Sequence, residues 1–575
     1  MKKKFAALLT IVLCCQTLWG CAKTTSVQQN QSTTVAETET ATEAENENGN
    51  GVNAAGLMEE INGSLTPIKT EDASHNYYAI FVYSFYDSDG DGIGDINGIT
   101  QKLDYLNDND DTTDDDLGVD GIWLMPIMPS SSYHKYDVDN YYEIDKQYGT
   151  LEDFQNLLAE CDKRGIKVII DLVMNHSSSQ NEWFLEACKY LQSLPKGSEP
   201  NEDECPYVSY YHFTKEAANK YHPVPQSEWY YEGQFQDGMP DLNLKSEKVM
   251  DEFEKITDYW LDMGVAGFRL DAVGEYETGS TEQSIAELTE FVERVKQKHP
   301  DCYLVGEVWQ DMTTYTKFYQ SGIDSCFDFA FADSTGVIAN TVKKANGYQA
   351  SSFGKAQVNI QNAILENGEN GVDAPFYTNH DMARGAGYYS GENSMAQTKI
   401  AQAMNLFMSG NAFLYYGEEL GMKGSGKDEN KRAPMYWSEN KTDTGICVGP
   451  PNMDSVKMKY GSLAAQKEDG DSIYQYIKQV YKLKSAYPQI ARGTVTFEEA
   501  SSGENICVVR KTYQDSEILI VYNISAEEQS VDLTGLSLEE GTKPEIGGIL
   551  LTGTESTSLT EEILTMPPYS VVILK

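Results

Sequence analysis

The sequence predicts an α/β fold: a (β/α)8 TIM barrel with a domain inserted after the third strand and an all-β sandwich domain at the C-terminus. Short apolar runs alternate with amphipathic, helix-like stretches eight times along the chain. The runs are continuously apolar, which is typical of strands that are buried on both faces. From about Gly493 the pattern changes to short alternating strands, which indicates a separate domain.

Eight runs rich in apolar, β-branched or aromatic residues are the expected barrel strands. In chain order they are 77–85, 118–126, 167–176, 267–273, 302–309, 326–331, 374–381 and 412–418. The amphipathic stretches between them are expected to form helices, for example 247–262, 281–298 and 396–408. After the eighth strand, Ser472 is expected to cap a last helix.

One connection is too long for a single βα unit. Between the third and fourth strands the chain runs from residue 176 to 267, and this part is polar, aromatic and rich in proline. We expect an inserted domain at 177–245 that overhangs the C-terminal ends of the barrel strands. The predicted barrel then comprises 64–176 and 246–488, and the predicted C-terminal domain comprises 489–575.

The composition limits the class of partner. The chain has 575 residues and a formal net charge of −45, so no basic surface is available to neutralise the phosphates of nucleic acid or anionic lipid. The 37 Tyr suit surfaces that stack on flat apolar faces and still form hydrogen bonds. We expect a monomer without a nucleic-acid partner.

The N-terminus is typical of an exported protein. Three Lys residues precede an apolar run that ends in LWGC at 18–21. This ending resembles the cleavage box of a bacterial lipoprotein, which implies a signal peptide at 1–21 and lipidation of Cys21. Residues 22–63 are polar, so we expect a flexible tether. The expected location is the cell surface, with the lipid anchor as the only membrane contact; simple secretion is the alternative.

The cysteines indicate neither zinc nor a disulfide framework. Ten are present, and three of them belong to the predicted signal peptide. The other seven are scattered, odd in number and without a Cys-x-x-Cys pair. We expect most of them to be buried free thiols.

The heptad GFRLDAV at 267–273 places Arg269 and Asp271 on the same face of a strand, because side chains alternate along a strand. A guanidinium beside a carboxylate lowers the pKa of that carboxylate and keeps it ionised, as a nucleophile or charge stabiliser requires. Such a pair at a strand end is also common as a purely structural ion pair, and both interpretations stay open at this point.

Ionisable residues stand at the ends of four predicted strands, where a barrel of this type carries its chemistry. They are Asp171 and His176 on the third strand, Arg269 and Asp271 on the fourth, Glu307 on the fifth, and His380 and Asp381 on the seventh. Four carboxylates in one pocket cannot all ionise easily, so at least one pKa is expected to be raised. This arrangement suits acid–base chemistry on an uncharged substrate.

Five ordered motifs resemble the signature regions of the α-amylase family of glycoside hydrolases. They are D-x-V-x-N-H at 171–176, MPDLN at 239–243, GFRLDAV at 267–273, GEVW at 306–309 and FYTNHD at 376–381. YYGEELGM at 415–422 resembles the end of that family's eighth strand. The match runs from about residue 77 to the C-terminus. It is similar to the members that are intermediate between oligo-1,6-glucosidases and neopullulanases.

The resemblance implies a retaining glycosidase. Asp271 would be the nucleophile and Glu307 the general acid and then the base, with their carboxyl groups about 5–5.5 Å apart. Arg269 would keep Asp271 ionised, and the apolar residues that follow Glu307 would help to raise its pKa. Asp381 would bind the 2- and 3-hydroxyls of the sugar and favour its distorted ring.

Further residues are implied to bind the sugar at the cleavage site. His176 and His380 would donate hydrogen bonds to its hydroxyls. Tyr136, which follows the second strand in YHKYDVDNYY, resembles the Tyr that stacks under the cleaved sugar; ordinary loop packing is the alternative. Asp137 would bind Arg432 or a sugar hydroxyl.

An acidic loop, DSDGDGIGD, follows the first predicted strand. Its alternate positions carry the candidate metal ligands Asp87, Asp89, Asp91, Ile93 and Asp95. The loop is not an EF-hand, because Gly98 takes the place of the bidentate Glu and a strand precedes it. It resembles the calcium loop after the first strand in many family members, which implies a structural Ca2+; a solvated acidic turn is the alternative.

The activity that the resemblance implies is that of an endo-acting α-amylase, which cleaves α-1,4-glucosidic bonds in starch and maltooligosaccharides. Ala272 favours α-1,4 cleavage, because members that act on α-1,6 bonds often have Val there. Gly274 and Glu275 stand where many amylases have Lys-His, so the leaving-group subsites depart from the family pattern.

Alternatives within the family are an exo-acting α-glucosidase or oligo-1,6-glucosidase, a neopullulanase and a glucan transferase. Outside it, the alternative is a non-catalytic glycan-binding surface protein.

Overall fold

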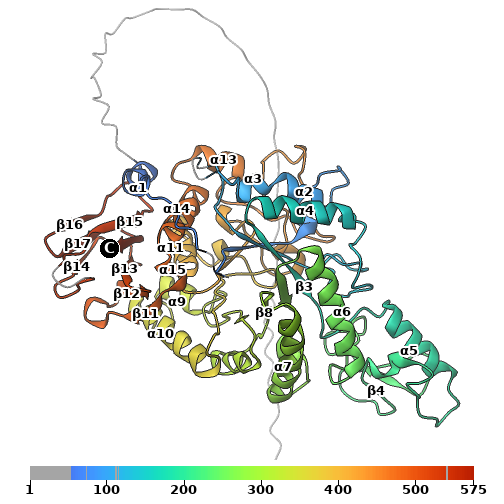
Figure 1. Ribbon diagram of the computed structural model, residues 1–575. Coiled ribbons are helices and arrows are strands. Elements are labelled where there is room, and N and C mark those ends of the chain that lie inside the picture. Colours follow the sequence, from blue (N-terminus) through green and yellow to red (C-terminus); the bar gives the residue numbers. More distant parts are fainter. Residues whose placement is uncertain (1–52, 71, 73, 111–112, 114, 539–541) are drawn as a thin grey trace, which may run out of the picture. The chain divides into compact units, whose positions relative to one another are not determined.

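A computed structural model describes residues 53–70, 72, 74–110, 113, 115–538 and 542–575 (Figure 1). The predicted signal peptide and the tether up to residue 52 lie outside the described residues. Within the described part of the chain, no helix is both long enough and apolar enough to cross a membrane.

A parallel barrel sheet forms the centre of the fold, as predicted. Its strands are β1 (Tyr77–Ile80), β2 (Gly121–Leu124), β3 (Lys167–Leu172), β7 (Gly267–Leu270), β8 (Tyr303–Gly306), β9 (Ser325–Cys326) and β10 (Phe413–Tyr415). They pair in the order β10-β1-β2-β3-β7-β8-β9, and every pair is parallel. Isolated parallel bridges of Phe327 to Ala374 and of Phe376 to Phe413 join the two ends of this sheet. The expected seventh strand is therefore reduced to these bridges, and it closes the barrel.

The register of the sheet brings the ionisable strand ends together. Asp171 on β3 lies opposite Arg269 on β7. Leu270, at the end of β7, lies opposite Gly306 at the end of β8, so Asp271 and Glu307 both follow directly. The strands are short and almost wholly buried, so these residues leave the sheet at one level.

Helices follow the strands in sequence. They are α2 (Ile96–Gln101), α3 (Leu103–Leu106), α4 (Leu151–Lys163), α6 (Glu247–Met263), α7 (Thr281–Lys298), α8 (Met312–Tyr315), α9 (Val337–Lys343), α10 (Ala350–Asn367), α11 (Ser394–Leu406), α12 (Asp428–Lys431), α13 (Leu463–Glu468), α14 (Ile473–Ala486) and α15 (Gln489–Arg492). The three helices predicted from amphipathic patterns are confirmed as α6, α7 and α11. Figure 1 shows α6 and α7 side by side. Ser472 caps α14 as predicted, because its side chain accepts a hydrogen bond from the backbone N–H of Gln475.

The insert after β3 is a small unit with its own sheet. It contains α5 (Glu182–Ser193), β4 (Phe213–Thr214), β5 (Tyr221–Pro223) and β6 (Tyr230–Glu232). The three strands pair antiparallel in the order β4-β6-β5. A backbone bridge between His176 and Asp241 ties the end of the insert to the residues that follow β3.

The C-terminal part is built from two antiparallel sheets. Its strands are β11 (Thr494–Phe497), β12 (Ile506–Tyr513), β13 (Ser516–Asn523), β14 (Gln529–Asp532), β15 (Ile546–Leu550), β16 (Ser558–Thr560), β17 (Ile563–Met566) and β18 (Ser570–Leu574). The larger sheet has the order β11-β12-β13-β18-β15 and the smaller one β14-β17-β16. Helix α10 packs against β11 and β12, and Gln361 on it pairs through its side chain with the backbone of Val495.

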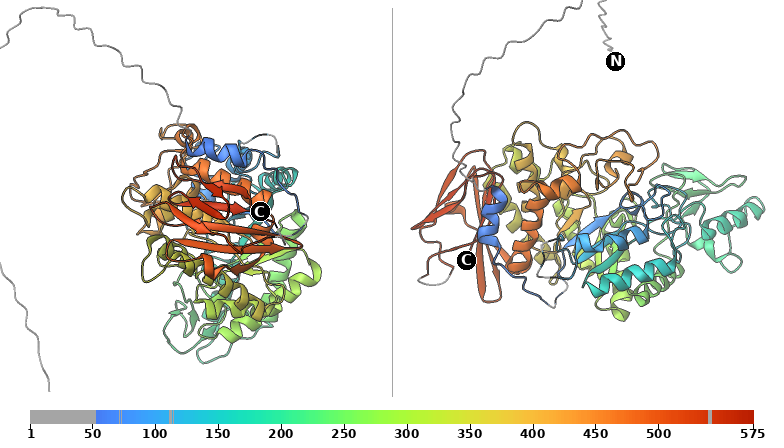
Figure 2. Two further views of the ribbon diagram at one scale, coloured as in Figure 1. Left: turned by 90° about the vertical axis from the view of Figure 1, so that its left-hand side faces the viewer. Right: turned by 90° about the horizontal axis from the view of Figure 1, so that it is seen from above.

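The predicted tether of 22–63 is too long at its C-terminal end. Residues Ala54–Asn62 form helix α1, which Asn53 caps. The side chain of Asn62 is fully buried and hydrogen-bonds both the N–H and the C=O of Ile549 on the edge strand β15. Figures 1 and 2 show α1 beside these C-terminal strands. Docking of Met58 and Asn62 repays the entropy of ordering, which the local composition alone does not indicate.

All seven Cys residues in the described part of the chain are free and buried, as expected. Burial raises the pKa of several of these thiols, for example Cys161 to about 12. They are therefore inert groups of the core rather than reactive ones.

Candidate active site

The side chain of Arg269, at the end of β7, lies between three carboxylates. Its Nη1 is 2.5 Å from Oδ1 of Asp171 and 2.6 Å from Oδ1 of Asp271, and its Nη2 is 2.9 Å from Oε2 of Glu307. The guanidinium side chain is only 1% exposed, so water screens these ion pairs little. One cation thus holds together carboxylates from three neighbouring strands.

Asp171 lies beneath this group and is the most enclosed of the carboxylates. Its Oδ2 accepts hydrogen bonds from Nε1 of Trp123 and from the hydroxyl of Tyr136. Burial raises the pKa of Asp171 to about 7, and Arg269 acts against that rise. The prediction that at least one pKa in this cluster is raised is confirmed, but burial is a larger cause than the crowding of like charges. Asp171 supports the site from below and does not line its cavity.

Burial also raises the pKa of Asp271 and of Glu307, although Arg269 opposes the rise in both. The expectation that Arg269 makes Asp271 more acidic than usual is thus wrong in its net direction, because the loss of water outweighs the guanidinium charge. Ala272 has a left-handed backbone with φ of 48°, and its N–H donates a hydrogen bond of 3.0 Å to Oε2 of Glu307. The strained turn after β7 therefore orients the carboxylate of the next strand.

Asp381 stands on the other side of the cavity, held by two partners. Its Oδ1 is 2.9 Å from Nη2 of Arg432, and its Oδ2 is 3.1 Å from Nε2 of His380. Burial opposes its ionisation, but His380 and Arg432 hold the pKa of Asp381 below its ordinary value. The hydroxyl of Tyr136 lies 2.7 Å from the same Nε2 of His380, and the two rings are stacked at 5.4 Å. Tyr136 therefore joins the Asp171 and Asp381 sides of the site.

The expected contact of Asp137 with Arg432 is not formed. The Asp137 carboxylate accepts hydrogen bonds from the hydroxyls of three residues in the preceding turn, Ser130, Ser131 and Ser132. Arg432 instead pairs with Asp381 and with Asp428, which lies four residues before it on α12. The serines of this turn, rather than Arg432, bind the Asp137 carboxylate, because they are only five to seven residues away in the chain.

A cavity of about 450 Å³ lies at this site. It is bounded by His134, Tyr136, His176, Phe235, Gln236, Met239, Asp271, Ala272, Gly274, Glu275, Glu307, Trp309, Asp381, Asp428 and Arg432. Within the described residues, Nε2 of His176 and Nδ1 of His380 are buried without a hydrogen-bond partner. Burial lowers the pKa of His176 to about 4, so its ring is neutral at pH 7. A buried neutral ring nitrogen without a partner is suited to bind a hydroxyl group.

Several cavity residues escaped the sequence prediction. Asp428 could have been found from its helical spacing to Arg432, and His134 from its place two residues before Tyr136. Phe235 comes from a loop of the insert that no local pattern links to the barrel. Its approach depends on how the insert folds back over the barrel.

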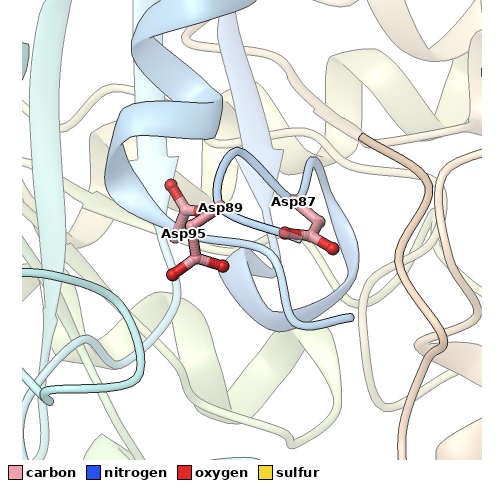
Figure 3. Close-up of side chains that lie close together, drawn as sticks. All are labelled: Asp87, Asp89 and Asp95. Carbon is pink, nitrogen blue, oxygen red and sulfur yellow. The ribbon is translucent and has the colours of Figure 1, made fainter. Parts of the chain in front are cut away.

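Three of the five predicted metal ligands come together in the loop after β1. Oxygen atoms of Asp87, Asp89 and Asp95 all lie within 4.8 Å of one another (Figure 3). The carboxylate of Asp91 accepts a hydrogen bond from the N–H of Ile93 and is outside this group. Clustered carboxylate oxygens are the ligands that hard cations such as Ca2+ prefer, so the group can hold a metal ion.

Comparison with known proteins identifies relatives over most of the chain. Residues 79–493 match the family "Alpha amylase, catalytic domain", and residues 509–573 match "Alpha-amylase SusG C-terminal domain". "Alpha-amylase 3" of Dictyoglomus thermophilum is 33% identical over 87% of this chain and 92% of its own length. "Glucan 1,6-alpha-glucosidase" of Streptococcus pneumoniae is 28% identical over 80% of this chain and 92% of its own. The solved structure "Eubacterium rectale Amy13B" is 47% identical, covers 90% of this chain and 98% of its own, and superposes with a TM-score of 0.86.

Proposed function

The chain belongs to the α-amylase family of glycoside hydrolases, and from that premise we propose that it is an endo-acting α-amylase. It cleaves α-1,4-glucosidic bonds in starch and maltooligosaccharides through a glycosyl-enzyme intermediate. The names of two similar proteins, an α-amylase of Dictyoglomus thermophilum and an α-amylase from H. orenii, support this activity.

One observation carries the mechanism: a single buried guanidinium, Arg269, contacts both Asp271 and Glu307. Two carboxyl groups that share one guanidinium are close neighbours. A close pair favours a retaining mechanism, because inverting enzymes keep the pair about 6.5–9.5 Å apart to admit a water molecule.

The proposed reaction has two steps. In the first, Asp271 attacks the anomeric carbon while the protonated Glu307 gives its proton to the departing glycosidic oxygen. In the second, Glu307 takes a proton from water as that water displaces Asp271 from the sugar, which restores both carboxyl groups and releases the α-anomer. The raised pKa of Glu307 favours its protonated state before the first step, and burial is the largest cause of that rise.

Further residues of the site are proposed to bind the sugar at the cleavage site. Asp381 is ionised, and Arg432 and His380 each contact one of its carboxylate oxygens, so it suits the 2- and 3-hydroxyls. The free ring nitrogens of His176 and His380 suit further hydroxyls. The ring of Tyr136 lines the cavity and suits a stacked sugar. Asp137 contributes indirectly, because its hydrogen bonds to the serine turn shape the loop that carries Tyr136.

We further propose that the metal of the loop after β1 is Ca2+. Asp87, Asp89 and Asp95 would hold it through carboxylate oxygens. Its role would be structural, because these ligands belong to a loop that does not line the catalytic cavity. Its two positive charges would offset most of the charge of the three clustered carboxylates in a chain with a net charge of −45.

We also propose that the protein acts at the cell surface, where it is held by a lipidated N-terminus. Two features support this location: the export-type sequence at 1–21 and the match of residues 509–573 to the C-terminal domain of SusG. The substrate would then be an extracellular α-glucan.

Product analysis tests the proposed activity. We expect amylose and long maltooligosaccharides to yield a range of short oligosaccharides at early times, and proton NMR to show the α-anomer first. Release of glucose alone from the chain end would instead favour an exo-acting α-glucosidase, an activity that names of similar proteins such as "Oligo-1,6-glucosidase" and "Maltase 1" keep open. Panose from pullulan would favour a neopullulanase, and longer products a glucan transferase. Binding of starch without hydrolysis would favour a glycan-binding protein.

A further inference from the structure

The side chain of Arg384, three residues after Asp381, is fully buried, and its guanidinium is bound mainly by backbone carbonyl groups. Its Nη1 donates a 2.6 Å hydrogen bond to the C=O of Tyr416, and its Nε donates a 3.1 Å hydrogen bond to the C=O of Lys431. The carboxylate of Glu418 is farther away, with Oε1 3.6 Å from Nη1. Because burial of a charge is costly, these contacts hold the cation firmly in place. The guanidinium therefore ties together the loops that follow the seventh and eighth strands.

The segment that leads to Arg432 is held at two places by Arg384. The backbone N–H of Arg384 donates a 2.9 Å hydrogen bond to the C=O of Gly424, and its side chain binds the C=O of Lys431, the last residue of α12. The hydroxyl of Tyr415 also donates to this carbonyl, at 3.2 Å. A helix of four residues is too short to be stable by itself, so α12 depends on such contacts for its position. The backbone just before Arg432 is therefore fixed from outside the helix.

The same short segment contacts Asp381 twice. Nζ of Lys431 donates a 2.7 Å hydrogen bond to the backbone C=O of Asp381, and Nη2 of Arg432 is 2.9 Å from its carboxylate. Lys431 and Arg432 are adjacent in the chain, and Arg384 follows Asp381 by three residues, so the contacts of these four residues form a closed ring. The carbonyl that Arg384 binds belongs to the peptide group between Lys431 and Arg432. Arg384 therefore fixes the point from which the Arg432 side chain extends towards Asp381.

The backbone of Arg384 is itself held by its neighbours. The N–H of the next residue, Gly385, donates a 3.2 Å hydrogen bond to Oε2 of Glu418, and the side-chain amide of Gln402 on α11 donates to the same oxygen at 3.0 Å. A Cβ atom at Gly385 would come within 2.7 Å of the ring of Tyr377 and 2.9 Å of the Glu418 carboxylate, so the chain passes close to the core here. Arg384 thus extends from a tightly packed turn.

We propose that Arg384 is a positioning residue, which holds the peptide before Arg432 so that the Arg432 guanidinium meets the carboxylate of Asp381. Arg384 does not line the catalytic cavity, whereas Arg432 and Asp381 do, so it acts on the substrate only through them. This inference rests on the proposed function, in which Asp381 binds the 2- and 3-hydroxyls of the sugar. Without Arg384 the ring of contacts opens, and Arg432 pairs with Asp381 for a smaller fraction of the time. Sugar binding then weakens, although every residue of the cavity is still present.

Steady-state kinetics on maltopentaose test this role in two backgrounds. Arg384→Met keeps a long unbranched side chain but removes its hydrogen bonds, and we expect it to raise KM by up to about tenfold with a smaller change in kcat. Arg384→Lys keeps the charge but has a single nitrogen in place of the fork that reaches two carbonyls, so it should raise KM less. In a chain that already carries Arg432→Ala, Arg384→Met should raise KM no further, because the residue through which Arg384 acts is gone.

A loss of stability alone does not produce this pattern. Asn62→Ala, which removes the buried amide that joins α1 to the C-terminal domain, is the matched control and should lower Tm but leave KM unchanged. If Arg384→Met does not fold, Arg384→Lys with and without Arg432→Ala makes the same comparison. An unchanged KM in the folded Arg384 variants, or the same increase in KM in both backgrounds, would show a purely structural role and overturn this inference while the proposed activity stands. A wild-type protein that does not cleave maltopentaose would overturn the proposed function instead.

Discussion

The guanidinium of Arg432 lies 2.9 Å from the carboxylate of Asp381 and joins the loop after the eighth strand to the end of the seventh. Together with His380 it lowers the pKa of Asp381, against the effect of burial. Removal of Arg432 leaves the Asp381 carboxylate with His380 as its side-chain ion-pair partner, so sugar binding should weaken. We expect Arg432→Ala to raise KM on maltooligosaccharides about tenfold, and Arg432→Lys to raise it less. The acidic limb of the kcat/KM profile should stay in place, because it belongs to Asp271, whose pKa is raised by burial. An unchanged KM in Arg432→Ala would contradict this role.

The nucleophile assignment predicts a severe and specific loss. Asp271→Asn is nearly isosteric and should still bind maltooligosaccharides, but kcat should fall on the order of 10⁴-fold or more. The exposed Asp262 offers a matched control, and Asp262→Asn should keep full activity. Starch hydrolysis at the wild-type rate by Asp271→Asn, in a protein with an unchanged melting temperature, would rule out this residue as nucleophile.

Calcium removal is expected to destabilise the protein. At free Ca2+ a hundredfold above Kd, binding stabilises the folded state by about 2.7 kcal/mol, and a chelator should remove this and lower Tm by several degrees. Asp89→Ala removes one of the three clustered carboxylates, so its Tm should no longer respond to the chelator. Differential scanning calorimetry with and without chelator measures both effects, and an identical Tm in the wild type would count against the site.

A buried acid pair predicts that stability falls as the pH rises. Burial raises the pKa of Asp328 to about 7. Burial also raises the pKa of Asp373, which hydrogen-bonds to Asp328. The folded protein therefore keeps protons that the unfolded chain has lost, so stability is full below about pH 4. The contribution of Asp328 to stability decreases until about pH 7, by up to about 1.4 kcal/mol per pH unit, and the raised pKa of Asp373 adds to this decrease.

Asp328→Asn should flatten this part of the stability profile. The amide oxygen can still accept the hydrogen bond from the hydroxyl of Tyr315, so the fold is retained. Urea unfolding between pH 5 and 8 measures the slope. Asp515→Asn, at an exposed turn of the C-terminal domain, is the control and should leave the slope as in the wild type. The same slope in Asp328→Asn would show that other groups cause it.

The docking of α1 predicts that the segment before the barrel contributes to stability. Asn62→Ala would leave the buried N–H and C=O of Ile549 without partners, at a cost of about 1–3 kcal/mol for the unsatisfied groups. The neighbouring Glu60 is exposed, and Glu60→Ala should be nearly neutral. Equal denaturation midpoints for the two variants would indicate that α1 is only loosely attached.

The fold could be predicted because it depends on local regularities. Buried parallel strands produce continuous apolar runs, and α6 shows its buried face at helical spacing, so each element is evident in a short window of sequence. The seventh strand was harder to predict from the sequence. Its residues meet the sheet only at isolated bridges, since closure of the barrel and not local propensity places them. Helix α1 was missed for a related reason, because its stability comes from the edge strand β15 nearly 500 residues away.

By itself the sequence determined which side chains meet at the centre. Arg269, Asp271 and Glu307 follow directly from strand alternation and from the rule that parallel strands end at one face. Only the tertiary structure decided the direction in which each pKa is shifted. Burial raises the pKa of Asp271 above its usual range despite the adjacent guanidinium. The tertiary structure alone also decided the partner of Arg432 and the bond between Arg384 and the carbonyl of Lys431. These depend on desolvation and on contacts between distant loops, which arise from the packed fold and leave no trace in a local pattern.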